Sequence, residues 1–244
     1  MAERPWKFES SPGHHLRPLR RFSTRQAACP VARREQGATL MTIHLHQGDL
    51  PPDLQWAEGA IAVDTETRGL RPERNRLCLV QLAGSDGACH LVRLAADRYE
   101  APNLKALLAD PERVKLFHFA RFDMAVIRKY LDVWAEPAWC TKIASKLVRT
   151  YTDRHGLAAL CKELLDIDLS KAQQCSDWGA EELSEAQLRY AAEDVLHLHA
   201  LKKQLEAMLA REQRAEMARR CFAFLRTRCA LDLAGWPDED IFAH

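Results

Sequence analysis

The sequence predicts an α/β domain built on a mixed sheet. Short strand-like runs come first along the chain, and segments of alternating strand and helix character follow them. This order of elements is typical of folds in which helices cover a sheet. A chain of 244 residues with 47% hydrophobic composition can also bury a sizeable core, so we expect one folded domain.

The predicted strands are apolar runs bounded by turn residues. "TIHLH" (42–46) alternates polar and apolar positions, and "QGDLPPDL" ends it. "AIAVDTE" (60–66) has the character of a central strand, and the turn "GSDG" joins "LCLVQLA" (77–83) to "ACHLVRL" (88–94). Because the connections are short, we expect the first three strands to form an antiparallel meander. A further strand is predicted for "VKLFHF" (114–119).

The predicted helices have apolar residues three or four positions apart. They cover 101–111, 120–131, 140–151 and 155–167. Pro111 ends the first of them, and Gly156 begins the last. One or two long helices should fill 183–221, with Ser184 as the N-cap.

Composition excludes several classes of protein. No apolar stretch approaches the ~20 residues that a membrane-spanning helix needs, and no apolar signal segment follows the N-terminus. The eight cysteines are scattered and form no C-x-x-C pair, which disfavours structural zinc and indicates free thiols in a reducing cytosol. We therefore expect a cytoplasmic protein that does not bind membranes.

The net charge of +1 conceals a difference between two parts of the chain. Residues 1–40 hold eight basic and three acidic residues, whereas 41–244 hold 27 and 31, a net of −4. We expect 1–40 to be a disordered basic leader and 41–244 to be the folded domain. A transit-like segment and a nucleic-acid-binding arm are alternatives for the leader. Met41 stands directly before a strand-like run and is a candidate for the true start.

Two carboxylates, Asp64 and Glu66, stand one residue apart at the end of the apolar run "AIAV". Residues i and i+2 of a strand project from the same face, so these side chains would lie side by side and raise each other's pKa. A solvated strand end would tolerate this pair, and a divalent cation would neutralise it. The pair alone does not decide between these interpretations.

Two later segments favour the cation site. Asp123, in "FHFARFDMAVI", lies on a predicted helix directly after a predicted strand. Tyr190 and Asp194, in "RYAAEDV", are four residues apart and so share one helix face, flanked by Ala191 and Val195. An aspartate in a partly buried helix is rare unless it is paired or bound to a metal.

The order and spacing of these motifs resemble the DEDD 3′–5′ exonucleases. The matching segments are "DTET" with Asp64 and Glu66, "FARFD" with Asp123, and "YAAED" with Tyr190 and Asp194. The tyrosine matches the tyrosine branch, because the histidine branch would place His where this chain has Arg189. Many relatives have Asn four residues before the aspartate that corresponds to Asp123. This chain has Phe119 there, so it lacks the polar contact that such an Asn would supply.

Further segments narrow the resemblance. "LSKAQQCSDW", followed by "LSEAQLRYAAEDV", is similar to the ribonuclease D group. Within that group, "CTKIAS", "RTYTDRHGL" and "DLAGWPDEDIFAH" resemble the short alphaproteobacterial proteins called nanoRNase C. The resemblance implies an RNase H-like (DnaQ-type) exonuclease fold, with a mixed central sheet flanked by helices.

The resemblance also implies two divalent ions, Mg²⁺ or Mn²⁺, which prefer hard carboxylate oxygens. It implies that Asp64 bridges both ions, that Glu66 and Asp194 hold the ion that activates water, and that Asp123 helps to hold the second. Tyr190 would orient the attacking water, because its ordinary pKa of ~10 makes it a poor base at neutral pH.

The candidates for substrate contact are less distinctive. The resemblance implies that Leu70, in the turn after "DTET", wedges against the terminal base. Arg149, Arg154 and His155, in "RTYTDRHGL", could hold a phosphate, although exposed arginines of a solvated loop would look the same. We assign His118 a substrate or packing role rather than metal ligation.

The charge of 41–244 indicates a short substrate, because affinity for long nucleic acids comes from neutralising many phosphates. About 50 residues follow Asp194, fewer than the helical RNA-binding domains of ribonuclease D relatives would need. The resemblance to nanoRNase C agrees. It implies release of nucleoside 5′-monophosphates from dinucleotides and other very short RNAs, by ring-shaped homo-oligomers.

Two other functions stay open. The protein could trim longer structured RNA, as ribonuclease D does, or act on DNA ends. An inactive nucleic-acid-binding scaffold is the remote alternative, and the presence of all four motif carboxylates disfavours it.

Overall fold

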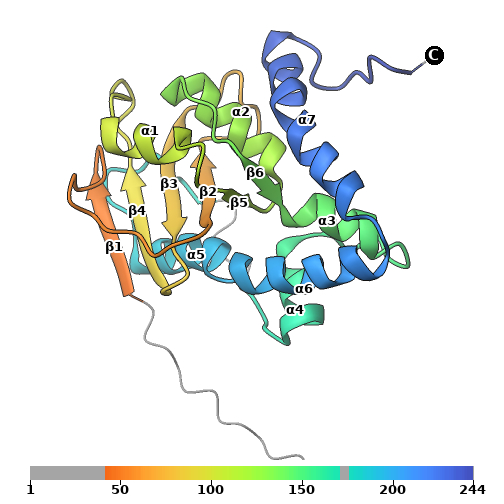
Figure 1. The fold of residues 1–244 in the computed structure, drawn as a ribbon. Coiled ribbons are helices and arrows are strands. Elements are labelled where there is room, and N and C mark those ends of the chain that lie inside the picture. The colour runs from red at the N-terminus through yellow and green to blue at the C-terminus, as the bar shows by residue number, and fades with distance from the viewer. Residues whose placement is uncertain (1–41, 171–175, 244) are drawn as a thin grey trace, which may run out of the picture. The chain divides into compact units, whose positions relative to one another are not determined.

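The computed structural model describes residues 42–170 and 176–243. The expected leader 1–40 and the proposed start at Met41 lie outside the described residues. From residue 42 onward the chain forms a mixed sheet with helices on both faces, as predicted (Figure 1).

Six strands form this sheet in the described part of the chain, in the order β1-β4-β3-β2-β5-β6. They are β1 (Thr42–Gln47), β2 (Ile61–Thr67), β3 (Leu77–Ala83), β4 (Ala88–Arg93), β5 (Lys115–Phe117) and β6 (Ala138–Cys140). The short strand β6 was not predicted, and the helix expected to start at Cys140 begins after it.

The antiparallel meander consists of β2, β3 and β4. The prediction that the first strand of the chain belongs to it is wrong. β1 pairs parallel with β4 at the edge of the sheet, with His44 beside His90. The segment 48–60, which contains Pro51 and Pro52, separates β1 from β2 in the sequence, and β4 and β3 separate them in the sheet. β5 continues the sheet on the other side, parallel to β2.

The helices are α1 (Pro102–Ala109), α2 (Ala120–Leu131), α3 (Thr141–Val148), α4 (Leu157–Leu165), α5 (Glu185–Leu196), α6 (Leu198–Arg211) and α7 (Ala215–Ala234). The predicted range of α2 is confirmed. The long pattern over 183–221 is divided into α5, α6 and the start of α7, rather than one or two helices. Ser184 caps α5 as predicted and forms a capping box with Gln187. No helix in the described ranges has both the length and the apolar character needed to cross a bilayer.

Alternation along β2 sorts side chains into two apolar cores, one on each face of the sheet. Val63 packs in the core formed with α1, α2 and α7, and Ala62 packs in the core formed with α3 to α6. By the same alternation Thr65 follows the face of Val63, whereas Asp64 and Glu66 follow the face of Ala62. Figure 1 shows α2 and α5 on opposite sides of the sheet near β2. The carboxyl end of β2 therefore presents polar side chains to both helical layers.

Candidate active site

Three of the four predicted carboxylates converge at the end of β2. Asp64 and Glu66 come from β2, and Asp194 comes from α5. One oxygen of each lies within 4.8 Å of the others, and all three residues are half-buried. The alternation of the strand and the capped start of α5 thus bring together carboxylates that are far apart in the sequence.

Asp123 approaches this group from the opposite layer. It lies in the first turn of α2 and is only 3% exposed. Its Oδ1 accepts a hydrogen bond of 2.7 Å from the Thr65 hydroxyl. Sequence analysis did not single out Thr65, although strand alternation was a signal that it faces away from Asp64 and Glu66. Thr65 therefore links Asp123 to the strand that carries Asp64 and Glu66.

A cross-strand contact fixes Asp64. Gln81, its partner on β3, donates a hydrogen bond of 3.2 Å from Nε2 to Asp64 Oδ2. The other polar side-chain atom of Gln81, Oε1, is buried without a hydrogen-bond partner among the described residues. A buried acceptor beside a carboxylate is normally satisfied by water or another donor, so this corner of the site has capacity for a further polar group.

Burial raises the pKa of every carboxyl group in this set. Burial first, and then the charges of Asp123, Asp194 and Glu66, raise the pKa of Asp64 well above its usual range. Burial, followed by the charges of Asp194 and Asp123, raises the pKa of Glu66 to about 9. Burial is also the largest cause of a pKa of about 7 for both Asp123 and Asp194.

No Lys, Arg or His within the described ranges forms an ion pair with any of the four carboxylates. Buried, mutually repelling carboxylates are stable in ionised form only with a cationic partner. An all-oxygen donor set suits hard divalent cations such as Mg²⁺ or Mn²⁺. The residues present therefore fit the cations that the sequence predicts.

Tyr190 lies one helical turn before Asp194, and its hydroxyl hydrogen-bonds to that carboxylate. Burial, and then the charges of Asp194, Glu66 and Asp64, raise the pKa of Tyr190 above its usual range. The phenol therefore stays protonated at neutral pH. Its ring centroid lies 6.1 Å from that of Trp178, which is buried and packs behind it.

Two clefts meet at these carboxylates. The first, which we call the leucine-side cleft, has a volume of about 840 Å³ and is lined by Leu70 and Trp178. The second, which we call the lysine-side cleft, has a volume of about 730 Å³ and is lined by Lys142. The two clefts share Asp64, Tyr190 and Asp194. A ligand at the carboxylates can therefore extend to either side.

Most of the predicted substrate contacts line these clefts. Leu70 is 89% exposed in the leucine-side cleft. His118, Arg154 and His155 line the lysine-side cleft. Burial lowers the pKa of His118 to about 3, and its Nδ1 lies 2.8 Å from the Thr141 hydroxyl, so the ring is neutral and fixed.

Arg149 contradicts the prediction that it contacts a phosphate. Its side chain is fully buried, and its guanidinium binds the Glu163 carboxylate, the Ser145 hydroxyl at 3.0 Å and the Arg154 carbonyl at 2.6 Å. A buried guanidinium needs such partners, and they occupy its donors. Arg149 supports the loop that carries Arg154 and His155 and does not line either cleft.

Lys142 was missed by the sequence analysis, although "CTKIAS" drew attention to its segment. Its Nζ lies 4.1 Å from the ring centroid of Phe119, and both residues line the lysine-side cleft. Phe119 is the N-cap of α2 with φ of 81°, a conformation that bulky residues rarely adopt. The position at which the resemblance implies Asn thus holds an exposed ring under a lysine.

Comparison with known proteins agrees with this geometry. Residues 50–210, about two thirds of the chain, match the family model described as 3′–5′ exonuclease. The chain belongs to the 3′–5′ exonuclease family. Within this family, ribonuclease D of Gluconacetobacter diazotrophicus is 38% identical over 159 residues, which is 65% of this chain. The match covers 40% of that ribonuclease, so the chain matches well under half the length of that relative.

Two solved structures are similar over almost their whole length. NrnC of Brucella melitensis bound to pGG has a TM-score of 0.81 and 53% identity, covering 84% of this chain and 99% of that one. The same nuclease with bound Mg²⁺ has a TM-score of 0.80 and 52% identity, covering 84% of this chain and 100% of that one. The predicted exonuclease fold and the resemblance to both the ribonuclease D and nanoRNase C groups are confirmed.

Proposed function

We propose that this protein is a 3′–5′ exoribonuclease that hydrolyses very short RNA, above all dinucleotides, to nucleoside 5′-monophosphates. The observation that carries this proposal is the pair of clefts that share Asp64, Tyr190 and Asp194. A phosphodiester placed at the carboxylates has room for one nucleotide on each side. The similarity to the NrnC structure bound to pGG supports the same size of substrate.

Asp64, Glu66, Asp123 and Asp194 are our candidates for holding two divalent ions, Mg²⁺ or Mn²⁺. Bound ions of this kind lower the pKa of a coordinated water and stabilise the leaving 3′ oxygen. Two of the carboxylates are held in place by neighbouring donors, because the Thr65 hydroxyl and the Gln81 amide each donate to one of them.

Tyr190 is our candidate for orienting the attacking water. With its pKa raised, its hydroxyl donates a hydrogen bond rather than abstracting a proton. Its contact with Asp194 places that hydroxyl beside the carboxylates, and Trp178 packs against the ring. One positioned donor of this kind is worth about 2–4 kcal/mol at the transition state.

The lysine-side cleft suits the 5′ nucleotide and its terminal phosphate. Lys142, Arg154 and His155 line it, with Asp153 as an acidic neighbour. On the other side of the carboxylates, the exposed Leu70 suits contact with the 3′ base. A substrate held at both ends gains the orientation that productive attack needs.

Trimming of longer RNA is the second candidate function, and the 38% identity to a ribonuclease D favours it. The net charge of −4 over 41–244 disfavours it, because a long backbone gains little affinity from such a surface. Activity on DNA, the homo-oligomer and the cytoplasmic location remain predictions.

The test compares a dinucleotide, with and without a 5′ phosphate, against a seven-nucleotide RNA and a DNA dinucleotide at identical salt and Mg²⁺. We expect kcat/KM for the phosphorylated RNA dinucleotide to exceed that for the heptamer at least about tenfold, because orientation at both ends is lost in the longer chain. Arg154→Met should reduce the advantage of the 5′ phosphate, and Asp64→Ala should abolish all hydrolysis. Equal rates for the dinucleotide and the heptamer, per 3′ end, would refute this proposal and favour the trimming of longer RNA.

A further inference from the structure

The end of α7 is tied to the start of α2 by two arginines that bind one carboxylate. Arg121 of α2 contacts both oxygens of Asp232, with Nε at 2.7 Å from Oδ2 and Nη2 at 2.8 Å from Oδ1. Arg228 of α7 contacts Oδ1 from Nε at 3.0 Å and from Nη2 at 2.8 Å. The Asp232 side chain is 10% exposed, so these charge-assisted bonds are shielded from water. The cluster fixes α7 on the helix that carries Asp123.

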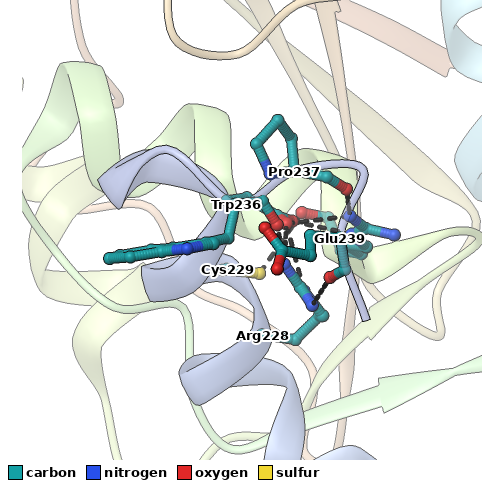
Figure 2. Close-up of polar contacts among 7 residues, drawn as sticks. Arg228, Cys229, Trp236, Pro237 and Glu239 are labelled. Atoms are coloured by element: carbon teal, nitrogen blue, oxygen red, sulfur yellow. Dashed lines mark hydrogen bonds and ion pairs between the residues drawn. The ribbon is translucent and has the colours of Figure 1, made fainter. Parts of the chain in front are cut away.

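The same arginines hold the segment that follows α7 (Figure 2). Gly235 ends the helix with φ of 112°, which turns the chain back. Arg228 donates to the carbonyl of Trp236 and, at 3.2 Å, to the carbonyl of Glu239. Arg121 donates to the carbonyl of Pro237. These bonds go to the main chain, so the path of 236–239 does not depend on its side chains.

This anchored segment forms one wall of a small third cleft, which we call the tail cleft. It has a volume of about 250 Å³ and lies among the loop after β2, the start of α2 and the chain after α7. It shares Leu70 and Phe122 with the leucine-side cleft and Phe119 with the lysine-side cleft. Pro237 and Asp238 contribute the wall from the C-terminal segment. The tail cleft therefore adjoins both substrate clefts.

Acidic side chains outnumber basic ones in the lining of the tail cleft. Its acidic lining residues are Glu73, Asp232 and Asp238, and its one lining cation, Arg121, is already bound to Asp232. Glu73 lies within 4 Å of two exposed arginines, which neutralise it only weakly. Within the described ranges Asp238 forms no ion pair. The charge of Asp238 acts on Arg121, whose pKa it helps Asp232 to raise, so it is neutralised only in part, and a further phosphate entering this cleft would meet the remaining negative charge.

We propose that the C-terminal segment 236–240 limits the length of the substrate. It forms a wall beside Phe119, at the edge of the lysine-side cleft that we assign to the 5′ nucleotide. The further nucleotides of a longer strand extend from that 5′ end, so the segment blocks their path and Asp238 repels their phosphates. This inference rests on the proposed preference for dinucleotides and assigns that preference to particular residues. Asp238 is a specificity-determining residue that does not touch a bound dinucleotide.

The test measures the ratio of kcat/KM for a seven-nucleotide RNA to that for a dinucleotide. We expect the ratio to rise in the order wild type, Asp238→Asn, Asp238→Lys, with an increase of about fivefold or more for the lysine at low salt, because charge contributes through long-range attraction or repulsion. Turnover of the dinucleotide should stay within about twofold of wild type.

The matched control is Glu239→Lys. It makes the same change of charge one residue further along, on a side chain that does not line the tail cleft, and it keeps the carbonyl that Arg228 binds. We expect this variant to leave the ratio within about twofold of wild type. Deleting 237–244 removes the wall itself and should raise the ratio about tenfold or more, because the path of the longer strand is then open.

The outcomes separate the two proposals. A wild-type enzyme that discriminates against the heptamer, together with an unchanged ratio in Asp238→Lys, overturns the inference and leaves the proposed function standing. Equal increases in Asp238→Lys and Glu239→Lys also overturn it, because they indicate a general surface charge effect. A wild-type enzyme without discrimination overturns both the proposed function and this inference, because no length limit then exists for the segment to impose. The point substitutions keep the test decisive if the deletion lowers the melting temperature.

Discussion

Asp194→Asn should make the metal-free protein more stable while it removes the activity. The aspartate is half-buried beside Asp64 and Glu66, and no cationic side chain of the described residues pairs with it. Asparagine has nearly the same shape, cannot ionise, and can still accept the hydrogen bond from Tyr190. The substitution therefore removes a buried charge with little change in packing.

The magnitude follows from the pKa of Asp194, which burial and the charge of Glu193 raise from 3.8 to about 7. Because the folded value is the higher one, ionisation destabilises the folded state progressively as the pH rises above 3.8. The destabilisation reaches its full value above pH 7. A difference of about three pKa units corresponds to at most about 4 kcal/mol at pH 8 and about 2 kcal/mol at pH 5. Asp194→Asn should gain up to these amounts.

The assay is urea unfolding of wild type and Asp194→Asn in EDTA at pH 5 and pH 8, repeated with Mg²⁺. The gain in unfolding free energy should be larger at pH 8. Added Mg²⁺ should then stabilise the wild type and reduce or reverse the difference, because the ion binds only the folded site. Glu182→Gln, which removes a carboxylate from an exposed loop position, is the control and should show neither effect. A variant no more stable than wild type at pH 8 in EDTA would refute the electrostatic account of the site.

Four further outcomes are expected. Asp64→Ala should abolish hydrolysis while circular dichroism and the melting temperature show a folded protein, and near-normal turnover would exclude a role at the metal site. Tyr190→Phe should lower kcat about 30-fold or more with an unchanged affinity for Mg²⁺ by calorimetry, because it removes one positioned donor and no metal ligand; equal kcat would leave the tyrosine only a packing role. Arg149→Met should lose about 1–3 kcal/mol of unfolding free energy, because it removes several charged hydrogen bonds. Arg154→Met should instead raise KM for the 5′-phosphorylated dinucleotide at constant stability, and the reverse pattern in these two variants would contradict the assignment of the loop.

The sequence by itself determined the α/β class, the start of α5 at Ser184 and the extent of α2, because each depends on local patterns. Apolar spacing marks a helix whatever surrounds it, and a capping residue acts within one turn. The order and spacing of the carboxylate motifs also identified the family before any geometry was known. The place of β1 in the sheet was not determined, because strand pairing depends on residues far apart in the chain.

Only the tertiary structure decided what the individual side chains can do. Arg149 and Arg154 are five residues apart in one motif, yet the fold buries the first against Glu163 and leaves the second in a cleft. Asp123 reaches the site from the other face of the sheet through Thr65, a link that exists only once α2 packs on β2. Burial, pKa and access to substrate are properties of neighbours in space, and for these residues the neighbours come from distant parts of the chain.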